Sequence, residues 1–103
     1  MVQPARLLWD GPAADVLWLL AVPPPVYWEA ERVAPGVSLF WALDAEEQRQ
    51  RVVGVEVVDA LYFTAWERLP QLPTLWELPG EPARPLVVVL QQAQQALRAG
   101  SQQ

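Results

Sequence analysis

Two glutamates and a serine are the residues of this chain whose spacing could support chemistry. In the strand pattern set out below, Glu31 and Glu56 are predicted to flank Ser38 on one face of a sheet. Carboxylates so placed could hold a divalent cation, receive an arginine of a partner protein, or perform acid–base catalysis if burial raised one pKa. We favour the alternative of a solvated strand face whose charges suppress edge-to-edge pairing.

The residue types that the chain lacks exclude most other kinds of active site. The 103 residues contain no histidine and no cysteine, and the seven cationic side chains are all arginines. Transition-metal ligands and the usual proton shuttle near neutral pH are therefore missing, as is a Schiff-base lysine. We predict no catalytic residues, no metal ligands and no cofactor. A carboxylate-dependent hydrolase built on Glu31 or Glu56 is the remaining, disfavoured enzyme hypothesis.

Charge and hydropathy narrow the range of partners. The net charge is −5 and the arginines are scattered along the chain, whereas nucleic-acid binding requires several cations on one surface. No apolar run approaches the roughly 20 residues that cross a bilayer, and the N-terminus lacks the pattern of a signal peptide. We expect a cytoplasmic protein that binds neither nucleic acid nor membrane. Its acidic surface suits a basic protein partner.

A sheet within a single domain, residues 1–103, must position these side chains. Apolar runs rich in β-branched and aromatic residues predict five strands over residues 5–60, namely 6–9, 16–22, 26–32, 37–43 and 51–58. Their short connections predict an antiparallel meander. Taking Arg32 opposite Val37 places Trp28 opposite Trp41 on a buried core face, together with Val53, Val55 and Val57. In the same register Phe40 lies opposite Gly54, as an aromatic ring covering a strand glycine does.

Residues 60–103 are predicted to be a helical and proline-rich extension of the same domain. Asp59 can cap a short helix over 60–69, and Thr74 can begin a single turn. The apolar spacing from Arg84 to Arg98 predicts an amphipathic helix that covers the core face. Its first part, Leu86–Leu90, also suits a strand because of its β-branched residues, and we favour the helix. The expected class is therefore α+β.

Six residues are predicted to be available to a partner: Glu31, Glu56, Trp66, Trp76, Val87 and Val88. The two tryptophans stand at an element end or near the proline-rich segment, which favours the surface. The two valines fall off the apolar stripe of the C-terminal helix and would be exposed unless a second chain covered them. Leu17 and Leu19 are expected on the back of the second strand, so that one layer cannot hide every apolar side chain. A symmetric homodimer is predicted on this ground.

Several short motifs together resemble a small bacterial domain family of unknown function, numbered 2283. They are Leu8-Trp9-Asp10, Asp15-Val16-Leu17-Trp18-Leu19, Pro35-Gly36-Val37 and the run from Val52 to Ala60. The resemblance covers about residues 5–60 and implies a compact antiparallel sheet with a helix, and an antitoxin-like role. Our leading hypothesis is a non-enzymatic interaction module that binds a small basic protein. The alternative is a small-ligand-binding domain that uses exposed tryptophans and carboxylates.

Overall fold

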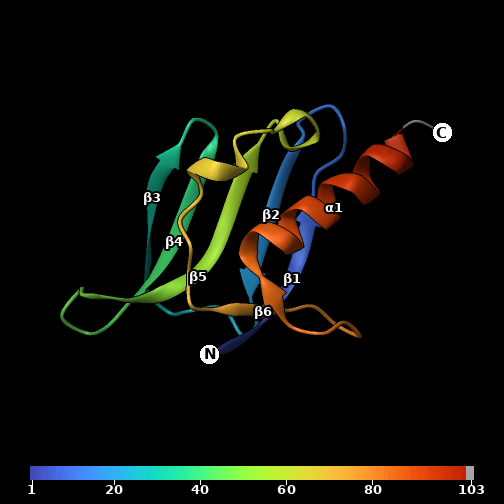
Figure 1. Ribbon diagram of the computed structural model, residues 1–103. Coiled ribbons are helices and arrows are strands. Elements are labelled where there is room, and N and C mark those ends of the chain that lie inside the picture. The colour runs from blue at the N-terminus through green and yellow to red at the C-terminus, as the bar shows by residue number, and fades with distance from the viewer. Residues whose placement is uncertain (102–103) are drawn as a thin grey trace.

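The computed structural model describes residues 1–101 as a curled sheet of seven strands with one long helix against it (Figure 1). The α+β class and the mostly antiparallel pairing are confirmed. The sheet has more strands than the five predicted. The strands are β1 (Val2–Trp9), β2 (Val16–Ala21), β3 (Trp28–Ala34), β4 (Val37–Leu43), β5 (Arg49–Val58), β6 (Leu75–Glu77) and β7 (Arg84–Pro85). The helix, α1, spans Leu86–Ser101.

The strand order is β3-β4-β5-β2-β1-β6-β7, so the predicted five-stranded meander is wrong. β3, β4 and β5 form a meander, but β2 pairs with β5 instead of β3. The connection from β2 to β3 contains Pro23, Pro24 and Pro25, which have no N–H to donate to a ladder. The chain therefore crosses to the far edge of the sheet instead of turning back as a hairpin. A parallel pair, β1 with β6, was also not predicted.

The register of β3 on β4 differs by one residue from the prediction. An irregularity between Arg32 and Ala34 places Trp28 opposite Ala42, and Glu31 opposite Leu39. Because strand side chains alternate between faces, this slip moves each side chain of β3 to the other face. Trp28 and Trp41 therefore lie on opposite faces, and Trp28 is exposed. The prediction of Trp28 as a core residue is wrong.

A second irregularity, between Phe40 and Trp41, changes the register of β5. Val55 and Val57 lie opposite Leu39 and Val37, as predicted. Val53 does not join them. The extra residue in β5 points the Val53 side chain toward a small separate cluster that contains Ala21, Ala42 and Phe40.

The main core lies between one sheet face, here called the helix face, and α1. All of its largest fully buried side chains are apolar: Trp76, Leu19, Leu39, Leu90, Val37, Val55, Val57 and Val89. The helix predicted for Leu86–Leu90 is confirmed, and α1 extends past Arg98. Leu17 and Leu19 are buried in this core, so their predicted place on an uncovered back face is wrong.

Residues 59–85 cross the helix face beside α1 without forming the predicted helix over 60–69 (Figure 1). Two single-turn 3₁₀ helices, η1 (Ala60–Tyr62) and η2 (Trp66–Arg68), stand there instead. The Gln94 amide donates to the carbonyls of Ala60 and Phe63, so tertiary contacts occupy carbonyls that a longer helix would use. Asp59 makes no side-chain cap. The turn predicted at Thr74 is wrong as well, because β6 begins at Leu75.

Gly54 carries a testable consequence of the β4–β5 register. The predicted pairing with Phe40 is confirmed. A Cβ atom at Gly54 would lie 2.7 Å from Cδ2 of Phe40 and 3.2 Å from the carbonyl oxygen of Leu19. Gly54→Ala is therefore expected to lower the free energy of unfolding by about 1–3 kcal/mol, as overpacking does. Chemical denaturation measures it, with Gly100→Ala as control because that Cβ meets nothing within 4 Å. Equal stabilities of the two variants would contradict the register.

Candidate binding groove on the open sheet face

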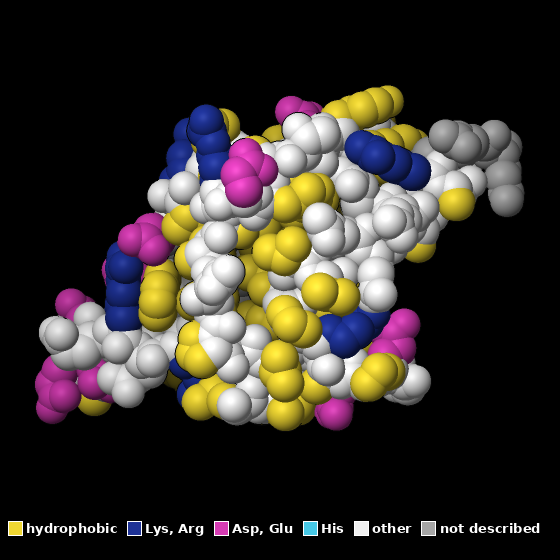
Figure 2. Space-filling view, in the orientation of Figure 1, with side chains coloured by type: hydrophobic (Ala, Val, Ile, Leu, Met, Phe, Trp, Pro, Cys, Tyr) yellow, Lys and Arg dark blue, Asp and Glu magenta, His cyan; other side chains and the backbone are white. Residues whose placement is uncertain are grey.

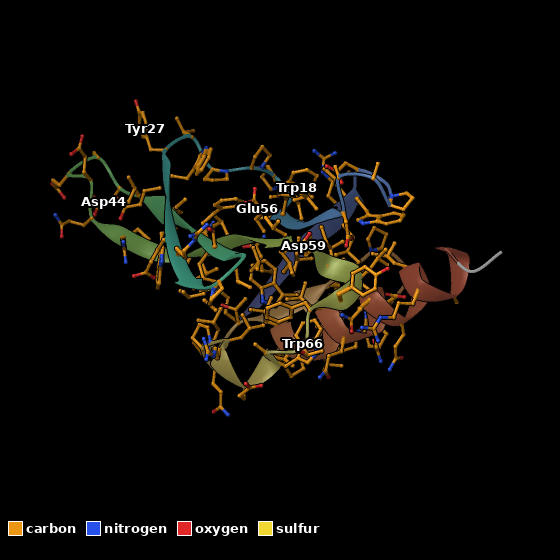
Figure 3. All side chains as sticks on the ribbon, turned by 90° about the horizontal axis from the view of Figure 1, so that it is seen from above. Trp18, Tyr27, Asp44, Glu56, Asp59 and Trp66 are labelled. Atoms are coloured by element: carbon orange, nitrogen blue, oxygen red, sulfur yellow. The ribbon has the colours of Figure 1, made fainter. Side chains whose placement is uncertain are left out.

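The sheet face turned away from α1, here called the open face, is covered by no other element of the described chain. Figure 3 shows Trp18 and Glu56 side by side on this face, while Trp66 lies on the α1 side. Large apolar side chains are exposed on the open face: Trp28 is 55% exposed, Val22 44% and Leu8 41%. An antiparallel sheet usually turns a polar face to water. The exposed aromatic and aliphatic side chains therefore point to a binding surface.

A groove of about 570 Å³ lies on the open face. Aromatic, aliphatic and proline side chains form most of the lining of the groove, and its charged residues are Arg6 and Glu56. Its principal apolar residues are Trp18, Leu20, Trp28, Phe40, Pro24 and Pro25. Its size and apolar lining are within the range of ligand and peptide pockets.

The strand pairings explain why the groove has this shape. Leu20 and Phe40 flank Gly54 on either side in register, and both side chains lie over the glycine. Trp28, from the edge strand β3, packs edge-to-face on Phe40 with ring centroids 5.1 Å apart. The β2–β3 connection adds Pro24 and Pro25 to the lining. The missing side chain at Gly54 thus leaves room for two aromatic rings to form one wall.

Glu56 is the anionic group of the groove. Its register partner on β2 is Trp18, and the indole Nε1 of Trp18 donates to Oε2 of Glu56 at 3.0 Å. The side chain is half-buried. This hydrogen bond orients both the carboxylate and the indole ring. On the other side Glu56 pairs in register with Ser38, as predicted.

Glu31 does not join Glu56, so the predicted arrangement of both carboxylates around Ser38 is wrong. The slip in β3 places Glu31 on the helix face, where Arg49 binds it at 3.1 Å and also binds Glu29. The Trp41 indole donates to Glu31 at 3.2 Å, and the Arg49 guanidinium lies 5.3 Å from the Trp41 ring centroid. The hydrogen bonds from Arg49 and from Trp41 lower the pKa of Glu31. A lowered pKa is the opposite of what a general acid requires.

The pKa of Glu31 provides a test of this cluster. Because the pKa in the folded protein lies below the usual 4.5, ionised Glu31 favours folding above that pH, and the contribution is lost as pH falls through the lowered value. Arg49→Gln is expected to raise the pKa of Glu31 toward 4.5, and Arg51→Gln to leave it unchanged. Carbon-13 NMR titration of the carboxyl resonance measures both. An unchanged pKa in Arg49→Gln would show that the ion pair does not persist in solution.

The other predicted partner residues do not gather on the open face. Trp76 is fully buried in the core, so its expected surface position is wrong. Trp66 packs edge-to-face on Phe63, with centroids 4.7 Å apart. Val87 is half-buried and Val88 is exposed at the start of α1. On the helix face, hydrophobic side chains reach the surface between residues 66–72 and the start of α1 (Figure 2).

Glu56 is thus the one predicted partner residue that lines the groove, and most groove residues were missed from the sequence. Trp28 and Phe40 were assigned structural roles, and Arg6 and Trp18 received none. A signal was present in β2, where Trp18 and Leu20 alternate with Leu17 and Leu19. A strand that is apolar on both faces needs a cover on each side. Here the structure supplies a cover on the helix face only.

Within residues 1–101, no group of three or more potential metal-ligating side chains lies together. No helix in that part of the chain is long and apolar enough to span a bilayer. Comparison of the chain with family models, curated proteins and solved structures gives no match. Function must therefore be inferred from the geometry of the groove.

Proposed function

We propose that the protein is a non-enzymatic interaction module that binds an apolar and basic segment of another protein in the groove of the open face. The observation that carries the proposal is an aromatic groove with a carboxylate inside it, on a sheet face that no described element covers. Exposed aromatic residues are typical anchors of protein interfaces. Trp28 is both the most exposed ring of the groove and part of its wall.

The sheet edges are less suited to binding than the face. β3, at one edge, carries Glu29, Glu31 and Arg32, and its ladder is irregular near Ala34. Charged side chains and irregularities of this kind discourage the addition of a further strand. The other edge, β7, is two residues long and continues directly into α1. A partner is therefore expected to approach the open face.

The negative net charge of the protein indicates that its partner is basic. The chain has a net charge of −5, and acidic side chains gather at the end of the molecule formed by the β4–β5 turn (Figure 2). These charges attract a basic protein over a distance and speed its encounter with the acidic one. A small basic protein, held as an antitoxin holds its toxin, is the partner that we propose.

Co-purification from the native host tests the proposed function. The tagged protein is expected to recover one stoichiometric basic protein. Trp28→Ser should release that protein, since it removes the exposed wall of the groove. Tyr62→Ser should retain it, because Tyr62 is 78% exposed but lies in η1, outside the groove. Circular dichroism verifies that both variants are folded.

Two results would contradict the proposal. One is a basic partner retained equally by Trp28→Ser and wild type, which would place the interface elsewhere. The other is a particle of twice the chain mass by light scattering, with no second protein present and sensitive to Trp28→Ser. That result would assign the groove to self-association. This is the predicted homodimer on the uncovered sheet face, with Trp18 and Leu20 there in place of Leu17 and Leu19.

A further inference from the structure

We propose that Glu56 and Trp18 form a binding site for a guanidinium group, supplied by an arginine side chain of the partner segment. The inference rests on the proposed function in taking the groove as the binding surface. It adds the chemical group that the groove recognises.

The state of the Glu56 carboxylate is the first reason. Oε2 accepts the indole N–H of Trp18 at 3.0 Å, whereas no hydrogen bond or ion pair within residues 1–101 reaches Oε1. The side chain is half-buried in a groove lined mainly by apolar groups. A partner that closed the groove would remove water from this carboxylate, at a cost in free energy unless a cation replaced the water. Charge-assisted hydrogen bonds to the carboxylate would offset that cost.

The aromatic lining is the reason for a guanidinium. Its planar, weakly hydrated cation stacks on aromatic rings while donating to a carboxylate, and a lysine ammonium does this less well. Trp18, fixed by its hydrogen bond to Glu56, presents an indole next to the carboxylate. Trp28 and Phe40 supply further rings in the same groove.

Arg6 does not already serve as the cation for Glu56. It lies on β1 opposite Leu20, whereas Glu56 lies on β5 opposite Trp18. Two strand spacings and two residues of offset separate their Cα atoms by about 12 Å. Arg32 faces Ser38, which faces Glu56 on the same side of the sheet, so Arg32 and Glu56 are two strand spacings apart, about 10 Å between Cα atoms. No ion pair in the described chain joins Glu56 to either arginine. The groove therefore has an anionic end at Glu56 and a cationic end at Arg6.

A pair of short peptides tests the proposal. The probe is acetyl-Leu-Arg-Leu-amide, and its matched control replaces arginine with citrulline, a neutral residue of nearly the same shape. Binding is followed by nitrogen-15 NMR through the indole N–H resonance of Trp18. The resonance of Trp76, which is buried on the helix face, serves as an internal reference. We expect the arginine peptide to shift the Trp18 signal and to bind about tenfold more tightly than the citrulline peptide.

Two variants separate charge from shape. Glu56→Gln retains a carbonyl oxygen that can accept from Trp18, so the groove keeps its form while its charge is removed. It should abolish the preference for arginine over citrulline. Arg6→Gln should preserve or strengthen arginine binding, because it removes a like charge from the groove.

The outcomes distinguish this inference from the proposed function. Equal binding of both peptides at Trp18 would overturn the guanidinium site while leaving the groove as an apolar binding surface. A preference for arginine that survives Glu56→Gln would also overturn it. If the native partner requires Trp28 but binds Glu56→Gln as tightly as wild type, the proposed function stands and the guanidinium site is overturned. No shift at Trp18 with either peptide, up to millimolar concentrations, would reject the site outright.

Discussion

Replacing Trp76 by alanine is expected to lower the free energy of unfolding by about 3–5 kcal/mol, the range of large aromatic truncations in protein cores. Trp76 is fully buried. It lies on β6, which pairs in parallel with β1 on one side and with β7 on the other. The truncation would leave a large cavity beneath α1 at the junction of these elements. Urea denaturation, followed by circular dichroism, measures the loss.

Trp76→Phe is the matched variant. The Trp76 Nε1 group is buried and has no hydrogen-bond partner within the described chain. Phenylalanine therefore keeps most of the apolar volume and loses no hydrogen bond, so the expected cost is less than half that of alanine. If the two variants were equally destabilised, filling of the cavity would not be the source of the effect. A loss below about 1 kcal/mol for Trp76→Ala would contradict its core position.

Replacing Asp15 by alanine is expected to lower the free energy of unfolding by about 2–4 kcal/mol, because two donors would lose one shared acceptor. The Asp15 carboxylate is buried and accepts the backbone N–H of Leu61 at 3.0 Å and the indole Nε1 of Trp9, also at 3.0 Å. It thus links the β1–β2 turn to η1, 46 residues later. Asp15 also adopts a left-handed backbone conformation, with φ of 52°, that alanine tolerates poorly.

Asp10→Ala is the control for Asp15, since both aspartates belong to the same turn. Asp10 is exposed, and its carboxylate accepts one backbone N–H, that of Val16, at 2.8 Å. Its removal is expected to cost about 1 kcal/mol or less. Thermal unfolding of both variants gives the comparison. A loss for Asp10 as large as that for Asp15 would mean that the buried link to η1 contributes little.

The extended segments of residues 1–60 could be read from local sequence. Alternating or continuous apolar runs bounded by glycine and proline predicted β4 with its observed ends, and β1, β2, β3 and β5 with shifted ends. The Phe40–Gly54 pair followed from the same reasoning. The apolar stripe from Leu86 predicted α1. The strand and helix spans depend on residues within a few positions of each other, so a sequence pattern carries the information.

The composition of the groove could not be predicted, because it depends on single-residue shifts. One irregularity in β3 moved Trp28 from the expected core to the open face and Glu31 from the open face to the helix face. One inserted residue in β5 separated Val53 from Val55. A strand side chain changes face with each residue of slip, and the pattern of β3 is compatible with both registers.

The sequence by itself determined that the chain forms apolar strands and one amphipathic C-terminal helix. It also limited the possible chemistry, through the absence of histidine, cysteine and lysine. The tertiary structure alone decided that β2 lies beside β5 and that Trp76 is buried. It alone placed Trp18, Trp28 and Glu56 in one groove. The physical reason is that strand order and burial are determined by contacts between residues far apart in the chain, whereas sequence patterns report only on near neighbours.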